Sequence, residues 1–312
     1  MALCTMSDDA LGVIFEGLRN VLEPRIVVDC SSTCKGLQAL TQPLRQQLRA
    51  DHGAAAELCL KLVDFTAAPT RSPRPMLNCK ELRLAKVVDC IYDGLTAAEL
   101  DTLGTLGSVL PALEELTIFA DGLDSVQRLT AGLGAGALPA LTRLTLIGVP
   151  VGDAGASALA AVLTRGALPR LKTLNLVNAS IGDAGLVALA PALRRRPALE
   201  RIGFPGGQPL GDEGLAALVA PPPPAGAPPP PTGVLTNLKT LDLNFTQITD
   251  AGCATLTAAL DSGALPALKH LNLKSGAHPA RDELCLCGIP ASAAATEAVR
   301  AALAKPRAAV SS

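Results

Sequence analysis

The chain has 312 residues, and 49% of them are hydrophobic although only 2% are aromatic and none is Trp. A core made of Leu, Val, Ile and Ala suits thin layers that are stacked at short distance. Charged residues make up 18% of the chain and the formal net charge is −1. The composition offers no large basic field that would attract a phosphate backbone, so we expect no nucleic acid partner.

Cysteine content and hydropathy indicate a compartment. The nine cysteines are odd in number, scattered and mostly set among apolar neighbours, as reduced and packed thiols would be. No apolar run reaches the roughly 20 residues that are needed to span a bilayer. We therefore expect a cytoplasmic or nuclear protein with no membrane partner.

The N-terminal segment, residues 1–50, carries two amphipathic stretches and no repeat. In MSDDALGVIFEGL the apolar residues fall on one helical face behind an acidic start, which is a typical helix beginning. The second stretch is IVVDCSSTCKGLQAL. Residues 51–78 are then expected to form a connecting helix and a linker.

The order of these two stretches resembles an F-box. The resemblance implies a surface that binds the Skp-type adaptor of a cullin ubiquitin ligase, although Met6 and Ser7 replace the usual Leu-Pro opening. The alternative is that the same residues are the buried face of an end cap, which a stack of repeats needs in any case. The predicted adaptor-binding residues are Leu11, Ile14, Phe15, Leu18 and Leu37.

A repeated LxxLxL pattern fills residues 79–290. It reads LTRLTL at 141, LKTLNL at 171, LKTLDL at 238 and LKHLNL at 268, with the variants LEELTI at 113, LERIGF at 199 and CKELRL at 79. Each match predicts a short strand whose fourth and sixth residues point inward. The pattern indicates about seven units, with a proline-rich insertion at 221–231 and a C-terminal capping helix and tail at 291–312.

Turn and helix signals follow the strands. In VGDAG, IGDAG, LGDEG and ITDAG an aspartate precedes a run of apolar residues at helical spacing, so we expect Asp153, Asp183, Asp212 and Asp250 to cap the helices that they begin. Proline often follows the helix, as in GALPAL, and it favours extended backbone at the residue before it.

These units resemble leucine-rich repeats of the ribonuclease-inhibitor class. The resemblance implies an α/β solenoid, a curved stack of strand-turn-helix units with a parallel sheet on the concave face and helices outside. The sequence departs from the family where Asn or Cys usually forms a hydrogen-bonded ladder, because Val149, Ala179 and Thr246 stand there. We expect that ladder to be absent or weakened.

The concave face is the expected binding surface for a protein target. No catalytic or metal-binding constellation is evident, so we expect neither enzyme activity nor a cofactor. The leading hypothesis is a substrate receptor of a cullin-type ubiquitin ligase; the alternatives are a stand-alone scaffold with a capping N-terminus and a GTPase-regulating repeat protein. The residues predicted on the concave face are Glu115, Thr117, Arg143, Thr145, Thr173, Asn175, Arg201, Thr240, Asp242, His270 and Asn272.

Overall fold

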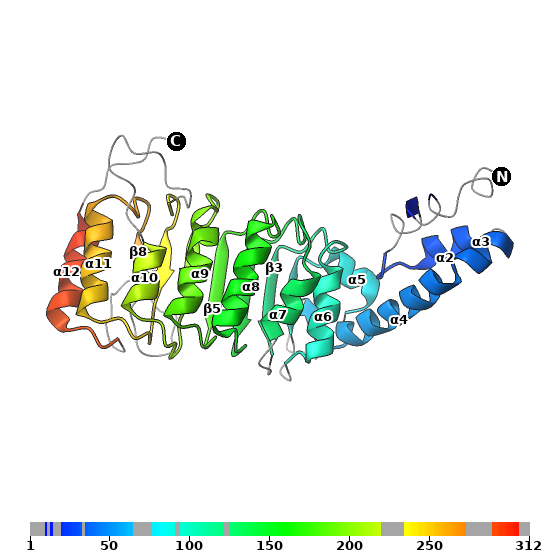
Figure 1. The fold of residues 1–312 in the computed structure, drawn as a ribbon, viewed down its shortest axis with the longest axis horizontal. Coiled ribbons are helices and arrows are strands. Elements are labelled where there is room, and N and C mark those ends of the chain that lie inside the picture. The colour runs from blue at the N-terminus through cyan, green and yellow to red at the C-terminus, as the bar shows by residue number, and fades with distance from the viewer. Residues whose placement is uncertain are drawn as a thin grey trace.

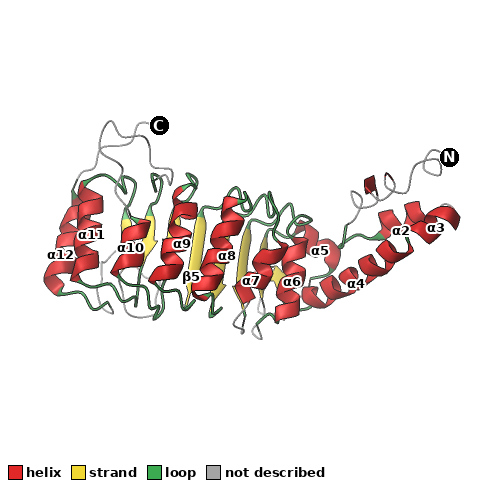
Figure 2. Cartoon of the chain, in the orientation of Figure 1, coloured by secondary structure: helices red, strands yellow, loops and turns green. Residues whose placement is uncertain are grey.

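The computed structural model describes residues 10, 13–14, 20–32, 35–64, 77–90, 94–120, 125–219, 234–272 and 289–305. Within these ranges strands and helices alternate, and the helices line one side of a single sheet (Figure 1, Figure 2). The strands are β1 (Leu62–Asp64), β2 (Val87–Cys90), β3 (Glu115–Phe119), β4 (Arg143–Ile147), β5 (Thr173–Val177), β6 (Arg201–Gly203), β7 (Thr240–Asp242) and β8 (His270–Asn272). The helices are α2 (Arg25–Ser31), α3 (Lys35–Leu40), α4 (Gln42–Cys59), α5 (Cys79–Leu84), α6 (Ala97–Leu106), α7 (Ser125–Gly132), α8 (Gly152–Thr164), α9 (Asp183–Arg194), α10 (Asp212–Leu218), α11 (Asp250–Asp261) and α12 (Ala293–Ala304).

The strand order in the sheet is the order along the chain, β1 to β8. β1 is antiparallel to β2, and every later pair is parallel. A parallel pair needs a crossover connection, and here helices supply it. The chain therefore advances by one strand and one helix at a time, as the predicted solenoid requires.

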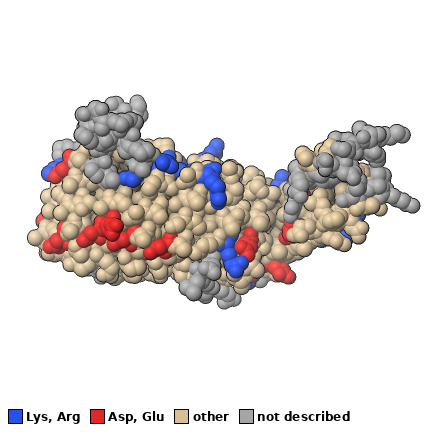
Figure 3. Space-filling model, viewed as in Figure 1, with Lys and Arg blue, Asp and Glu red and all other residues tan. Residues whose placement is uncertain are grey.

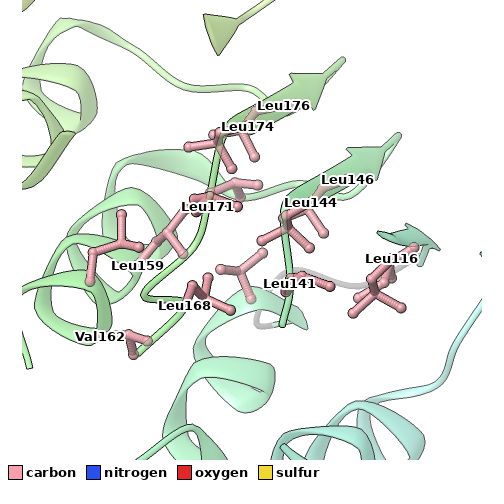
Figure 4. Packing of buried hydrophobic residues seen from close by; sticks show 14 of the residues in the cluster. Leu116, Leu141, Leu144, Leu146, Leu159, Val162, Leu168, Leu171, Leu174 and Leu176 are labelled. Carbon is pink, nitrogen blue, oxygen red and sulfur yellow. The ribbon is translucent and has the colours of Figure 1, made fainter. Parts of the chain in front are cut away.

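The core follows the predicted alternation along β2, β3, β4 and β5. Leu144 and Leu146 of β4 are 3% and 1% exposed, and the outward residues between them are not buried. Figure 4 shows these leucines pointing to the same side as Leu174 and Leu176 of β5, toward Leu159 of α8. One continuous layer of aliphatic side chains thus joins sheet and helices.

The strand predicted within CKELRL is wrong, because Cys79–Leu84 is helix α5. The Asn78 side chain accepts hydrogen bonds from the amides of Lys80 and Glu81, and the Glu81 carboxylate accepts one from the Asn78 amide. This capping box begins a helix. The strand of this unit is β2, whose Val88 pairs with Leu116; its inward residues are mostly too small to show the leucine pattern.

Aspartates at the helix starts do not cap their own helices, which corrects the capping prediction. Asp183 is the first residue of α9, yet its Oδ1 accepts hydrogen bonds from the amides of Gly211 at 2.7 Å and Gly214 at 2.9 Å. Gly211 is the N-cap of α10 and has no side chain of its own. Each carboxylate therefore caps the helix of the following unit. The same relation joins Asp153 to Gly182 and Gly185, Asp212 to Thr249, and Asp250 to Ser292.

We call Asp153, Asp183, Asp212 and Asp250 the aspartate ladder. Its carboxylates lie at helix N-termini, where negative charge is favourable. In Figure 3 acidic side chains gather in a row over the C-terminal part of the helical face. The ladder fixes each unit to the next at one edge of the stack.

Residues before proline also differ from expectation. Leu138 and Leu168 precede Pro139 and Pro169 but have φ values of 50° and 52°, in the left-handed region rather than extended. Both leucines are buried, and each amide donates to a carbonyl of the preceding unit: Leu168 to Ala137 at 3.0 Å, for example. Core contact and this hydrogen bond offset the roughly 1–2 kcal/mol that the backbone conformation costs.

The side chain of Gln208 forms hydrogen bonds between units, as the Asn or Cys side chains of related repeats do. Gln208 is fully buried, and its Oε1 accepts a hydrogen bond from the Ile181 amide at 3.1 Å while its Nε2 donates to the Leu176 carbonyl. It bridges the segment after β6 to the preceding unit. Val149, Ala179 and Thr246, which stand where the family usually has Asn or Cys, are buried, and the Thr246 hydroxyl donates to the Leu243 carbonyl of its own unit.

Helices occupy both ends of the described stack. α2, α3 and α4 extend beyond the first strands (Figure 1), with Val27, Leu37 and Leu48 buried among them. α12 packs on α11 at the other end. The proline-rich segment 221–231 lies outside the described residues, between α10 and β7 in the chain.

Candidate protein-binding face

Outward residues of β2 to β8 form what we call the sheet face, the side of the sheet opposite the helices. Strand register places them in rows. The first row is Val87, Glu115, Arg143, Thr173, Arg201, Thr240 and His270, and the second is Asp89, Thr117, Thr145, Asn175, Gly203, Asp242 and Asn272. All eleven residues that the sequence predicted for the binding face therefore lie in these two rows.

Exposure differs along the rows. Arg143, Arg201 and His270 are exposed, whereas Thr240 is only 6% exposed. The short Thr240 side chain lies between Arg201 and His270 in the register, and these larger neighbours shield it. Thr240 is therefore a poor contact residue, and the side chain of Asn272 lies outside the described part of the chain.

The sequence missed several residues of this face. Val87 and Asp89 begin the two rows, but the misplaced first strand hid them. A third row, Phe119, Ile147 and Val177, follows the same register toward the strand ends. Phe119 is 37% exposed. The outward position one step past each LxxLxL pattern would have revealed this row.

A depression of about 390 Å³ lies on the sheet face between β4 and β7. Besides row residues it is lined by side chains that stand just before the strands. Its lining is Thr142, Arg143, Lys172, Thr173, Asn175, Glu200, Arg201, Lys239 and Thr240. Four cations and one carboxylate surround it, so the depression is locally basic although the chain as a whole is not.

Backbone hydrogen bonds hold these charged residues at fixed spacing. The Lys172 carbonyl accepts hydrogen bonds from the amides of Glu200 at 2.8 Å and Arg201 at 2.9 Å, and the Glu200 carbonyl accepts one from the amide of Lys239 at 2.7 Å. The same pattern recurs from Lys86 to Lys269. The side chains thus project from a rigid backbone.

Two carboxylates partly neutralise the depression. Glu200 pairs with Lys239 at 2.8 Å, and this hydrogen bond lowers the pKa of Glu200. Glu115 lies 3.6 Å from Arg143. The charge of Lys172 also contributes to the lowered pKa of Glu200. Neither Lys172 nor Arg201 forms a direct ion pair with any residue that the structure describes, so each can still pair with an anionic ligand.

The structure describes two of the five predicted adaptor-binding residues, Ile14 and Leu37. Leu37 lies in α3 and is 2% exposed, so its side chain packs inside the N-terminal helices instead of forming a docking surface. Ile14 is helical and half-buried. Leu11, Phe15 and Leu18 lie outside the described residues, and their role stays a prediction.

An apolar groove of about 750 Å³ lies between the N-terminal helices and α5. Ile26 and Leu60 line it and are 51% and 54% exposed. Cys59 and Cys79 also line it, with 3.9 Å between their sulfur atoms. The groove is an apolar hollow on the described N-terminal part.

Among the described residues, no cluster of three or more His, Cys, Asp or Glu is arranged to hold a metal ion. None of the described helices is long and apolar enough to cross a membrane. His270 is exposed on β8, and Cys59, Cys79, Cys90 and Cys253 are buried thiols that form no disulfide. The polar sheet face is consequently the best-defined candidate site.

The family model described as Leucine Rich repeat matches residues 168–190 and 234–256, which include β5 and β7 with the turns that follow. No curated protein matches the chain. Among solved structures, an internalin (inlF) from Listeria monocytogenes is 12% identical, with 82% of this chain and 93% of that chain covered and a TM-score of 0.19.

Proposed function

We propose that this leucine-rich-repeat solenoid is a protein-interaction module that holds a target on its sheet face. One observation carries the proposal: polar residues of consecutive parallel strands lie in register on a face that the helices leave uncovered. Arg143, Arg201 and His270 are exposed there, and their backbone is fixed by amide-to-carbonyl hydrogen bonds between successive units. A preorganised surface lowers the entropy cost of binding.

A tryptophan scan tests the sheet face. Thr117→Trp and Thr145→Trp place a bulky side chain in the second row, and Ser157→Trp places one on the exposed side of α8 as control. Immobilised full chains are exposed to lysate and retained proteins are compared. We expect proteins held by the wild type and by Ser157→Trp to be lost from both threonine variants. Equal retention by all variants would contradict the proposal.

The finer assignment to ribonuclease-inhibitor-like repeats also belongs to this proposal. Its support is the unit length, since Glu115 pairs with Arg143, 28 positions later, and Arg143 pairs with Thr173, 30 positions later. A reducing compartment, the cytoplasm or nucleus, is supported by the free thiols at Cys59, Cys79 and Cys253.

A second candidate function is substrate receptor of a cullin-type ubiquitin ligase. It is supported by the F-box-like order of the sequence and by the apolar groove between the N-terminal helices and α5, where Ile26 and Leu60 are exposed. The sheet face would then recruit the target, and the N-terminal helices would bind a Skp-type adaptor. If they do not, they only cap the stack.

A pull-down of the full chain with a Skp-type adaptor distinguishes these roles. The Phe15→Asp, Leu18→Asp double variant is the test, and Val187→Asp, at an apolar residue exposed on α9, is the control. Binding by the wild type and the control, but not by the folded double variant, supports the receptor role. A folded wild type that binds no adaptor contradicts it.

A further inference from the structure

The basic depression on the sheet face identifies a kind of partner. We propose that it binds an extended acidic segment of a protein, rich in Asp or Glu, that crosses β4 to β7. The inference rests on the proposed function, because it assumes that the sheet face is where a target is held.

Unneutralised charge is the first support. Arg143, Lys172, Arg201 and Lys239 surround the depression, against the single carboxylate of Glu200 in its lining. Glu200 pairs directly with Lys239 and also interacts with the charge of Lys172, whereas neither Lys172 nor Arg201 forms a direct ion pair with any described residue. A negatively charged ligand could form ion pairs with both of these side chains.

The spacing of the cations indicates an extended ligand. Arg143 and Arg201 lie in the same row, with Thr173 of β5 between them. Neighbouring strands are about 4.8 Å apart, so β4 to β7 span roughly 14 Å. A single carboxylate cannot reach across this distance. An extended peptide rises about 3.3 Å per residue, so about four or five residues suffice.

Polar side chains and the rigid backbone fit a peptide further. Thr173 and Asn175 line the depression, and their hydroxyl and amide groups can donate to carboxylate or peptide oxygens. The Thr142 hydroxyl already donates to the Glu114 carbonyl. The backbone carbonyl of Lys172 is fixed by two amides of the following unit. Hydrogen-bond donors and cations therefore stand ready without large rearrangement.

Nucleic acid is the less favoured ligand. Glu115 and Glu200 flank the cations. A nucleic acid carries a charge on every phosphate and would meet these carboxylates, whereas a peptide can place uncharged residues opposite them. Among the described residues that line the depression, none has an aromatic side chain on which a base could stack.

The test uses a fluorescein-labelled peptide of alternating Glu and Gly, with a matched peptide of Gln and Gly, and measures fluorescence anisotropy with the full chain. We expect the Glu peptide to bind and the Gln peptide not to bind. The Lys172→Glu, Arg201→Glu double variant should bind the Glu peptide about 10- to 30-fold more weakly, because two exposed pairs contribute up to about 1 kcal/mol each and about 1.4 kcal/mol corresponds to a factor of ten.

The Lys80→Glu, Arg165→Glu double variant makes the same charge change at exposed residues of α5 and the end of α8, and it should bind like the wild type. Undiminished binding by Lys172→Glu, Arg201→Glu, binding of the Gln peptide with equal affinity, or no binding of the Glu peptide would overturn the inference. If a thymidine oligonucleotide bound more tightly than the Glu peptide, the ligand of the depression would be a nucleic acid and not an acidic protein segment.

Failure of this inference is distinguishable from failure of the proposed function. If the Lys172→Glu, Arg201→Glu variant still retains the same lysate proteins as the wild type and the Thr145→Trp variant does not, the sheet face binds protein but not through its cations. If neither change affects retention, the sheet face itself is not the binding site.

Discussion

The carboxylate of Asp183 accepts a hydrogen bond from the backbone amide of Gly214, 31 positions later in the chain, at 2.9 Å. The two residues belong to helices of successive units, α9 and α10. An ideal Cβ on Gly214 would lie 2.8 Å from the same carboxylate oxygen. The aspartate of one unit and the second glycine of the next unit's motif therefore fit together, and the repeated GDAG pattern records a contact between units.

Loss of an aspartate in the ladder should weaken the whole stack. Asp183→Ala removes the acceptor for two amides of α10 and should lower the free energy of unfolding by about 1–2 kcal/mol. Asp183→Asn keeps an acceptor oxygen and should cost less. Urea unfolding followed by circular dichroism measures both. The control is Asp101→Ala, which breaks the exposed ion pair with Arg128 and should lower the free energy of unfolding by at most about 1 kcal/mol. If Asp183→Ala and Asp101→Ala lowered it equally, the stabilising role of the aspartate ladder would be refuted.

Replacing glycine by alanine should change the free energy of unfolding in opposite directions in two helices, α11 and α4. An alanine Cβ at Gly252 would overlap Asp212 Oδ1 and lie 2.7 Å from Ile248, so Gly252→Ala should destabilise the protein by about 1–3 kcal/mol. Gly53 is exposed in α4, and a Cβ added there would meet nothing within 4 Å. Gly53→Ala should therefore stabilise by about 0.5–1 kcal/mol. Thermal unfolding of the two variants checks the signs, and a stable Gly252→Ala would show that the contact is loose.

Arg196 should stabilise the opposite edge of the stack. Its guanidinium donates to the carbonyls of Leu168 at 2.9 Å and Ala167 at 2.8 Å, and also to that of Leu163, near the C-terminus of α8. Arg196→Met keeps most of the aliphatic length but leaves these carbonyls without the donor, and it should cost about 1–3 kcal/mol. Arg165→Met, at an exposed position, is the comparison. Native-state hydrogen exchange should localise the effect to the end of α8; unchanged exchange there would count against it.

Buried thiols should make the protein sensitive to alkaline pH. Burial raises the pKa of Cys90 to about 12 and that of Cys253 to about 11, from 9.0. Because the folded pKa is the higher one, the stabilisation is complete below about pH 9 and is lost as the pH rises toward the folded pKa. The urea midpoint should therefore begin to fall at about pH 9 and keep falling as the pH rises toward the folded pKa values of about 11 and 12. Cys90→Ala should reduce the slope of this fall, and an unchanged slope would contradict the assignment.

Much of the stack could be predicted from the sequence, because leucine positions report burial directly. The LxxLxL matches at 113, 141, 171, 199, 238 and 268 all contain strands of the sheet. The first unit was missed since Ala85, Val88 and Cys90 replace the leucines there, while CKELRL imitates the pattern on a helix. The inward positions of this unit are in the expected register, but their side chains are smaller than leucine, so the sequence pattern did not reveal them.

Contacts between units could not be predicted from one unit at a time. The capping role of Asp183 toward Gly211, the bridge from Gln208 to Ile181 and the left-handed backbone of Leu168 all depend on a neighbouring unit. On the sheet face, the row residues were predictable from alternation. The depression was not, because Lys172, Glu200 and Lys239 precede the strands and meet only when the strands are in register.

Site-specific photo-crosslinking tests the central claim, that the sheet face holds a protein target, most directly. A benzophenone amino acid replaces Thr145 in the second row or, as the matched control, Ser157 on α8, and crosslinked species are compared after irradiation in lysate. We expect discrete crosslinked proteins from position 145 and none from position 157. Crosslinks from position 157 alone, or from neither position in a folded chain, would contradict the claim.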